Sequence, residues 1–146
     1  MSGEYPALLK KRALSMLRLA ERLLGEGEYD LVVLHSEYAV QLYLKALLYR
    51  LTGEEYRGHN LRALLGALAA VLEEKGFREQ AGAVIDFVRR FRRELSELEE
   101  GHIRSVYGVY EYADYQARRL LESAKRVIEL LKRIEEEVFR EHAMAP

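Results

Sequence analysis

Residues 29–51, YDLVVLHSEYAVQLYLKALLYRL, place apolar side chains on almost every side of a helix. Such a helix is stable only where neighbours cover it on several sides, so we expect this segment at the centre of a bundle. It keeps one polar file, Glu37, Gln41 and Lys45, whose members are four residues apart. Because four residues are a little over one helical turn, these side chains share one face. The file is therefore either a solvated edge with a row of weak salt bridges or the lining of a site.

Four further segments repeat apolar residues at steps of three and four, as amphipathic helices do: residues 6–25, 61–75, 81–98 and 114–141. Only two prolines occur, Pro6 and Pro146, so none interrupts a helix in the interior. Asp30 suits the start of the central helix as a cap, and Asn60 suits the start of the helix predicted over residues 61–75. With no strand-like alternation, the sequence predicts one all-α domain over residues 1–146, an antiparallel up-and-down bundle of four to five helices.

The composition excludes several classes of function. With 49% hydrophobic and 32% charged residues the chain is globular, and its net charge of -1 gives no bulk attraction to nucleic acid or membrane. The absence of cysteine excludes disulfides, thiolate metal sites and a cysteine nucleophile. No signal peptide and no uncharged span of about 20 residues occur, so we expect a cytoplasmic protein. Abundant Glu and Arg with scarce Asn are typical of a thermophilic source.

The histidines do not have the spacing of a metal site. They fall on separate predicted elements, without a pair four residues apart: His35, His59, His102 and His142. A metal site needs several convergent ligands, so we predict none, and no cofactor is expected. We expect His59 to be structural at the start of a helix and His35 to be a hydrogen-bonded core residue.

Arginines are dense in the fourth helical segment. Arg89 and Arg93 are predicted to share a face, with Arg92 near its edge. This basic strip is either a solvated face or a contact for RNA phosphates or an acidic partner.

Residues 99–115, EEGHIRSVYGVYEYADY, contain two glycines and four tyrosines and show no clean period. We expect this to be the longest irregular segment, and such loops are often functional. Arg104 within it either binds phosphate or pairs with a nearby glutamate such as Glu99. Tyr107 and Tyr110 either contact a substrate or pack with the hydroxyl at an edge.

Three pieces of sequence resemble one known family when taken in order. They are the segment 25–53 with Gln41 and Lys45, the turn GHNLRALL at residues 58–65, and Arg104 before a tyrosine-rich stretch and an alanine-rich last helix. Over about residues 8–135 this order resembles the HEPN domain family (higher eukaryotes and prokaryotes nucleotide-binding).

The resemblance implies a four- to five-helix bundle that is usually a homodimer and is often encoded beside a minimal nucleotidyltransferase, in a toxin–antitoxin-like pairing. Many members are metal-independent endoribonucleases with an Arg, four to six residues and then a His, facing the same motif of a second protomer. Here Arg104 is followed after five residues by Tyr110, a phenol in place of the imidazole. The resemblance makes Arg104 and Tyr110 the catalytic candidates, and the candidates for binding nucleotide or RNA are Glu37, Gln41, Lys45 and Tyr107.

Three functions stay open at this point. The first is a HEPN dimer that binds nucleotide or RNA. The second is an active ribonuclease that uses Arg104 with a substitute acid or base, because a phenol with a pKa of about 10 is a poor base at neutral pH unless its environment shifts it. The third is a protein-interaction module without catalysis.

Overall fold

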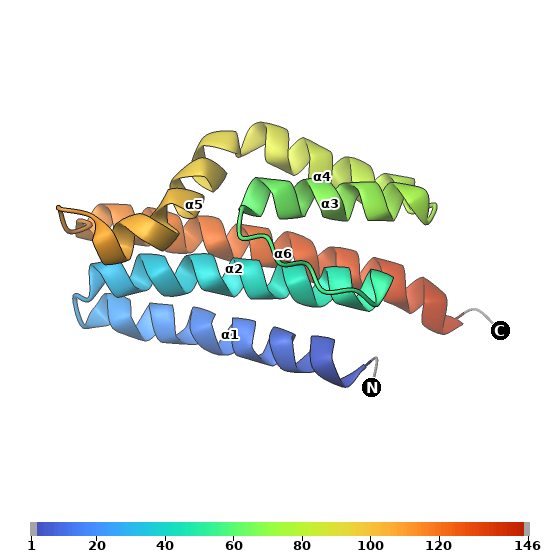
Figure 1. Cartoon of the computed structure of the whole chain (residues 1–146), viewed down its shortest axis with the longest axis horizontal. Helices are drawn as coiled ribbons and strands as arrows, with labels where there is room; N and C mark the ends of the chain where they lie inside the picture. The colour runs from blue at the N-terminus through green and yellow to red at the C-terminus, as the bar shows by residue number, and fades with distance from the viewer. Residues whose placement is uncertain (1–2, 145–146) are drawn as a thin grey trace.

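The computed structural model describes residues 3–144, and side chains for residues 3–140. Within this part of the chain all regular structure is helical, in six elements (Figure 1): α1 (Glu4–Gly25), α2 (Tyr29–Thr52), α3 (Leu61–Glu74), α4 (Arg78–Arg90), α5 (Arg92–Tyr107) and α6 (Asp114–Met144). The all-α class and the helical bundle are confirmed, with one helix more than the expected four to five. No helix in the described part is long and apolar enough to cross a membrane.

Helix α2 lies at the centre of the bundle, as its all-round apolar pattern predicts. It contacts α1, α3, α5 and α6 (Figure 1), and its apolar side chains, from Val32 to Leu51, form much of the core. Gly53 ends α2 in the left-handed conformation, φ 76°, and its N–H donates to Tyr49 O at 2.7 Å. Glycine suits this position because other residues are strained there.

The segment 53–60 modifies the simple up-and-down order. It runs back along α2, so that α3 starts beside the middle of α2 and follows the same direction (Figure 1). Asn60 caps α3 as predicted, because its Oδ1 accepts from Ala63 N–H at 2.8 Å. This course carries His59 to the polar file of α2.

The predicted cap at Asp30 is wrong. Asp30 lies inside the first turn of α2, and the residue before the helix, Glu28, makes no side-chain cap. The Oδ1 atom of Asp30 accepts from Tyr112 N–H at 2.9 Å instead. Asp30 therefore fastens the segment between α5 and α6 to the start of α2.

The fourth predicted helix is broken at Phe91, where the backbone turns to φ -113° and ψ 28°. Beyond the break α5 departs from the direction of α4 (Figure 1), because α4 packs mainly on α3 whereas α5 packs mainly on α2.

The prediction of a long irregular segment over residues 99–115 is also wrong. Helix α5 extends to Tyr107, and only residues 108–113 of this segment are non-helical. The buried face of α5 consists of Leu95, Leu98 and Gly101. Because the third of these positions is a glycine, the apolar repeat cannot be recognised there in the sequence.

A half-buried carboxylate joins α1, α2 and α6. Glu135 accepts from Lys10 Nζ at 2.9 Å, from the Tyr43 hydroxyl at 2.8 Å and from Arg50 Nη1 at 3.2 Å. Burial would raise the pKa of Glu135, but the hydrogen bonds from Lys10 and Tyr43 and the charges of Lys10 and Arg50 outweigh it and lower this pKa. Burial, together with Glu135, raises the pKa of the Tyr43 phenol.

Candidate functional site

The polar file of α2 points into the bundle. Glu37 and Gln41 are 0% and 1% exposed, and Lys45 is half-buried. Gln41 Nε2 donates to Glu37 Oε2 at 3.0 Å. Glu37 and Gln41 therefore form no solvated edge, and a buried carboxyl of this kind requires hydrogen-bond partners from other elements.

Two histidines supply these partners. His102 Nδ1 on α5 lies 2.6 Å from Glu37 Oε1, and His59 Nδ1 before α3 lies 2.7 Å from Gln41 Oε1. We call Glu37, Gln41, His59 and His102 the α2 polar cluster. The Gln41 amide turns its NH₂ to Glu37 and its oxygen to His59. His59 therefore donates through Nδ1.

The electrostatics of the cluster are set by burial. Burial raises the pKa of Glu37, and the hydrogen bond from Gln41, the charge and hydrogen bond of His102 and the charge of Lys45 only partly oppose it. Burial likewise lowers the pKa of Lys45, against the charges of Glu37 and Glu55.

The two imidazole rings face each other. Their planes are 7° apart and their centroids 6.2 Å apart, and Tyr38 approaches His102 edge-on at 5.0 Å. His59 is exposed, and the His102 side chain is 27% exposed. Each ring uses Nδ1 to reach α2, and neither Nε2 atom has a hydrogen bond within the described residues.

Lys45 opens into a cavity of about 300 Å³ between α1, α2 and the segment 53–60. Its lining consists of Tyr5, Leu9, Leu42, Lys45, Tyr49, Glu55, Tyr56 and Arg57. Tyr5 and Tyr49 meet edge to face with centroids 5.2 Å apart. Aromatic rings beside Lys45 and Arg57 suit a planar base that carries a phosphate.

Arg104 lies on the last turn of α5 rather than in a loop. It is exposed, its Cζ lies 5.1 Å from the centre of the Tyr112 ring, and it has no ion pair within the described residues. Glu99 binds Arg62 instead, with Nη2 at 3.1 Å. Gly108 N–H donates to Arg104 O at 2.8 Å, and a Cβ on Gly108 would come within 2.5 Å of that oxygen. The chain can thus reverse tightly over Arg104 because residue 108 is glycine.

Tyr107 and Tyr110 are 80% and 79% exposed, so neither ring packs within the protomer. Three apolar neighbours are exposed with them, Ile103 at 63%, Val106 at 54% and Val109 at 89%. We call the whole group the α5 tip: Ile103, Arg104, Val106, Tyr107, Val109 and Tyr110.

The predicted site residues form two separate groups. His102 and Arg104 are two positions apart on α5, about 200° around the helix, so they point to nearly opposite faces. Glu37, Gln41 and Lys45 lie on the His102 face, whereas Arg104 borders a small cavity of about 170 Å³ with Tyr112 and α6. The protomer therefore does not bring Arg104 or Tyr110 to the polar file.

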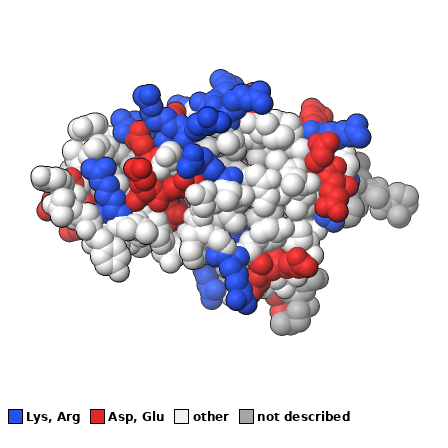
Figure 2. All heavy atoms as spheres, turned by 45° about the horizontal axis from the view of Figure 1, so that its top comes forward, with Lys and Arg blue, Asp and Glu red and all other residues white. Residues whose placement is uncertain are grey.

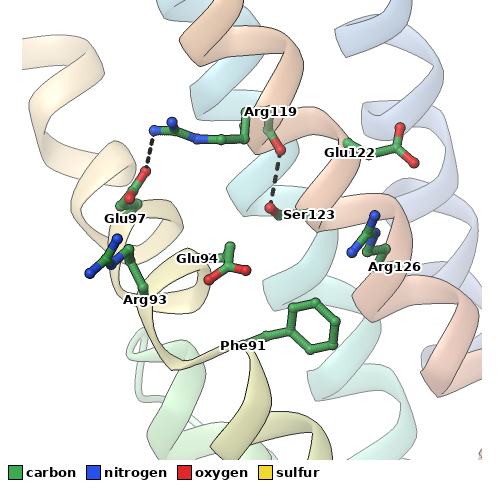
Figure 3. Close-up of a pocket in the computed structure, with 8 residues that line it drawn as sticks. All are labelled: Phe91, Arg93, Glu94, Glu97, Arg119, Glu122, Ser123 and Arg126. Carbon is green, nitrogen blue, oxygen red and sulfur yellow. Dashed lines mark hydrogen bonds and ion pairs between the residues drawn. The ribbon is translucent and has the colours of Figure 1, made fainter.

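A cavity of about 450 Å³ lies between α5 and α6 (Figure 3). The Phe91 ring extends toward α6 near Arg126, whose Cζ is 5.6 Å from the ring centre. Arg119 pairs with Glu97 at 2.6 Å, and both residues also border the Arg104 cavity. The two cavities are lined by as many glutamates as arginines. Figure 2 shows acidic and basic side chains interspersed also on the face that it presents. We therefore expect neither cavity to be selective for anions.

Sequence reasoning gave His59 and His102 no role in a shared site. The available signal was the polar file itself, because buried polar groups on an apolar helix require partners and imidazoles are suitable ones. His35 was expected in the core but is half-buried, with Nδ1 2.7 Å from Leu31 O. His142 lies outside the residues whose side chains are described. Among those described, no three His, Asp or Glu side chains converge as metal ligands.

Fold and site together define a class of protein: an all-α bundle with a polar cluster on its central helix and an arginine at the end of the helix before the last. The family model described as HEPN domain matches residues 7–134, so this chain belongs to the HEPN domain family. The resemblance seen in the sequence is thereby confirmed. No curated protein and no solved structure matches the chain significantly.

Proposed function

We propose that this HEPN protein is a homodimer that binds single-stranded RNA through the α5 tip. The observation that carries the proposal is the exposed arginine Arg104, which has no ion pair in the described part of the chain and is followed within six residues by the exposed rings of Tyr107 and Tyr110. Arginine recognises phosphate through several donors at once, and tyrosine rings stack on unpaired bases.

The overall charge sets the expected strength of binding. A net charge of -1 adds no long-range attraction, so affinity depends on these few local groups. Neutralising few phosphates gives a shallow salt dependence, whereas stacking on two rings contributes about 1–3 kcal/mol per base. Two protomers side by side would double both contributions.

The apolar part of the α5 tip supports the dimer. Ile103, Val106 and Val109 expose more than half of their surface in the protomer. Contiguous apolar surface of this kind on a folded domain is typical of an interaction site. Burial of this surface against a second copy would bring the two Arg104 residues to one cleft, as the family pattern implies.

The test for RNA binding is fluorescence anisotropy with a labelled 12-nucleotide single strand in buffer containing a chelator. Arg104→Ala and the double variant Tyr107→Ala/Tyr110→Ala should each raise Kd about 5- to 100-fold. The control is Arg133→Ala, an exposed arginine on α6, which should leave Kd within about twofold. An unchanged Kd in the α5-tip variants would contradict the proposal.

The test for the dimer is light scattering coupled to gel filtration. Ile103→Asp/Val106→Asp should convert a dimer of the wild type into a monomer of unchanged helix content, because charge is costly in a buried interface. A monomeric wild type at micromolar concentration would rule the dimer out.

A metal-independent ribonuclease that uses Arg104 is the second candidate, because the arginine occupies the family position before the last helix. Cleavage lost in both Arg104→Ala and Tyr110→Phe would favour it over binding alone.

Family membership further supports our proposal of a nucleotidyltransferase partner, in a toxin–antitoxin-like pairing, in the cytoplasm. Co-purification from the native cell tests that pairing. Recovery of a dimer without a partner would count against both the nucleotidyltransferase partner and the interaction module. The thermophilic source stays a prediction.

A further inference from the structure

We propose, on the basis of the RNA binding proposed above, that the cavity of about 450 Å³ between α5 and α6 takes up one guanine base of the bound strand. We call it the Phe91 cavity. Three features of the molecule lead to this ligand: two unpaired charges of opposite sign in the lining, an aromatic ring between them, and the neighbouring position of Arg104.

The Phe91 cavity has the size of a small-molecule site, because ligand cavities in proteins have volumes of about 300–1,000 Å³. Figure 3 shows the Phe91 ring directed toward α6, with Glu94 on the α5 side of it and Arg126 on the α6 side. The Phe87 ring packs against Phe91 with centroids 4.5 Å apart and supports it. The Arg126 Cζ atom lies 5.6 Å from the centre of the Phe91 ring. Ring and guanidinium together offer surfaces on which a planar base can stack.

Glu94 and Arg126 are the charged groups of interest in this lining. Neither makes an ion pair or a side-chain hydrogen bond within the described residues, whereas Arg119 and Glu97 pair with each other at 2.6 Å. Glu94 is half-buried and Arg126 is exposed. A carboxylate only accepts hydrogen bonds and a guanidinium only donates them. The cavity therefore suits a neutral ligand that offers donors to Glu94 and acceptors to Arg126.

Guanine is the RNA base with this pattern. Its N1–H and N2–H groups are adjacent donors, on which one carboxylate can accept twice, and its O6 and N7 atoms are adjacent acceptors that arginine binds through two donors. Adenine and cytosine present an acceptor nitrogen where guanine has N1–H, and uracil has a single N–H between two carbonyls. Glu94 would thus read the N1 and N2 edge, Arg126 the O6 and N7 edge, and Phe91 would stack on the ring.

The Phe91 cavity lies on the same face of α5 as Arg104. Glu94, Glu97 and Arg104 follow one another after three and seven residues, and this spacing keeps them on one side of the helix. Ten residues of helix span about 15 Å, a length that a short single strand can cover. Glu97 and Arg119 border both the Phe91 cavity and the cavity beside Arg104. One strand can therefore contact Arg104 with a phosphate and the Phe91 cavity with a base.

The balance of charge assigns different parts of the strand to the two places. The lining of the Phe91 cavity contains three arginines and three glutamates: Arg93, Arg119, Arg126, Glu94, Glu97 and Glu122. Such a lining gives a phosphate no net attraction, but it offers a polar neutral base hydrogen bonds of both kinds. Phosphate contact stays with Arg104, and base selection belongs to the Phe91 cavity.

The first experiment varies the RNA. Fluorescence anisotropy in buffer containing a chelator compares a labelled 12-nucleotide strand of uridines with strands that carry one other base at the centre. Guanine should lower Kd about 5- to 100-fold, whereas adenine and cytosine should not lower it. Inosine lacks the N2 amine and 7-deazaguanine lacks N7, so each should lose part of the gain. These analogues separate the contact of Glu94 from that of Arg126 without any change to the protein.

The second experiment varies the protein. Glu94→Gln and Arg126→Gln should each bring the Kd of the guanine strand to within about threefold of the uridine strand, while the Kd of the uridine strand stays within about twofold of wild type. Glu129→Gln and Arg133→Gln are the matched controls. Both residues are exposed on α6 and lie outside the lining of the Phe91 cavity, so these variants should keep the full preference.

Free GMP distinguishes a base in a strand from a free nucleotide. It lacks the contact with the α5 tip, so it should displace the guanine strand only at concentrations at least about tenfold above the Kd of that strand. Equal potency of GMP would overturn the strand as the ligand.

The remaining outcomes separate the two proposals. Equal Kd values for the guanine and uridine strands, or a preference that persists in both Glu94→Gln and Arg126→Gln, would refute the guanine site and leave RNA binding by the α5 tip standing. A preference that depends on Glu94, together with a Kd unaffected by Arg104→Ala, would refute the proposed function alone. Failure of every strand to bind would remove both.

Discussion

The Nδ1 atom of His102 lies 2.6 Å from the Oε1 atom of Glu37, although 65 positions separate the two residues. Glu37 is fully buried, so this contact joins α5 to the central helix inside the core. A buried carboxyl is costly without partners, and every alternative placement of α5 on α2 would lose this one. The contact therefore helps to fix the position of α5.

The first prediction concerns the coupling of these two residues. A double-mutant cycle of Glu37→Ala and His102→Ala should give an interaction energy of about 0.5–3 kcal/mol by urea unfolding at pH 7. A matched cycle of Glu37→Ala with Arg89→Ala, on the exposed face of α4, should be additive within about 0.5 kcal/mol. Additivity in both cycles would mean that the contact does not contribute to the fold.

The second prediction concerns the close packing of Gly101. A Cβ on Gly101 would collide with the Val33 side chain on α2, so Gly101→Ala should lower the free energy of unfolding by about 1–3 kcal/mol. Val33→Ala should recover part of the loss in the double variant. Gly66→Ala on α3 is the control: its Cβ meets nothing within 4 Å, and it should stabilise by about 0.5–1 kcal/mol. Equal effects at both glycines would contradict the packing.

The third prediction concerns pH. The pKa of Glu135 is lowered in the folded protein, so its ionised form stabilises the fold above the ordinary carboxyl pKa of about 4.3, and this contribution is lost as pH falls through the lowered value. Glu135→Gln should cost about 1–3 kcal/mol at pH 7 and progressively less as the pH is lowered through the acidic range, measured by urea unfolding. Exposed Glu129→Gln should show no such pH dependence. A loss independent of pH would rule out the ion cluster as its cause.

The fourth prediction concerns the bond between Asp30 and Tyr112. Asp30→Ala removes the acceptor of the Tyr112 N–H, so residues 108–113 should open more readily. Hydrogen exchange at the Tyr112 amide should accelerate about 5- to 20-fold, which corresponds to about 1–2 kcal/mol. Glu111→Ala, exposed in the same segment, should leave that rate unchanged. Unaltered exchange in Asp30→Ala would show that the segment is held by packing alone.

Short-range patterns made much of the fold predictable. The all-round apolar pattern placed α2 at the centre, and Asn60 was recognised as a cap because capping depends on residues three positions apart. Asp30 misled the same reasoning, since its carboxylate has a distant partner in Tyr112 that competes with capping. The break at Phe91 escaped because the apolar repeat continues through it, while the change of packing partner, from α3 to α2, is not local.

By itself, the sequence determined the all-α class, the family and the polar file of α2, because these follow from periodicity and order along the chain. Only the tertiary structure decided what the file contacts. Gly101 breaks the apolar repeat of α5 yet allows its approach to Val33, and that approach brings His102 to Glu37. The return of residues 53–60 along α2 brings His59 to Gln41. Such convergence depends on long-range packing, which no local spacing encodes.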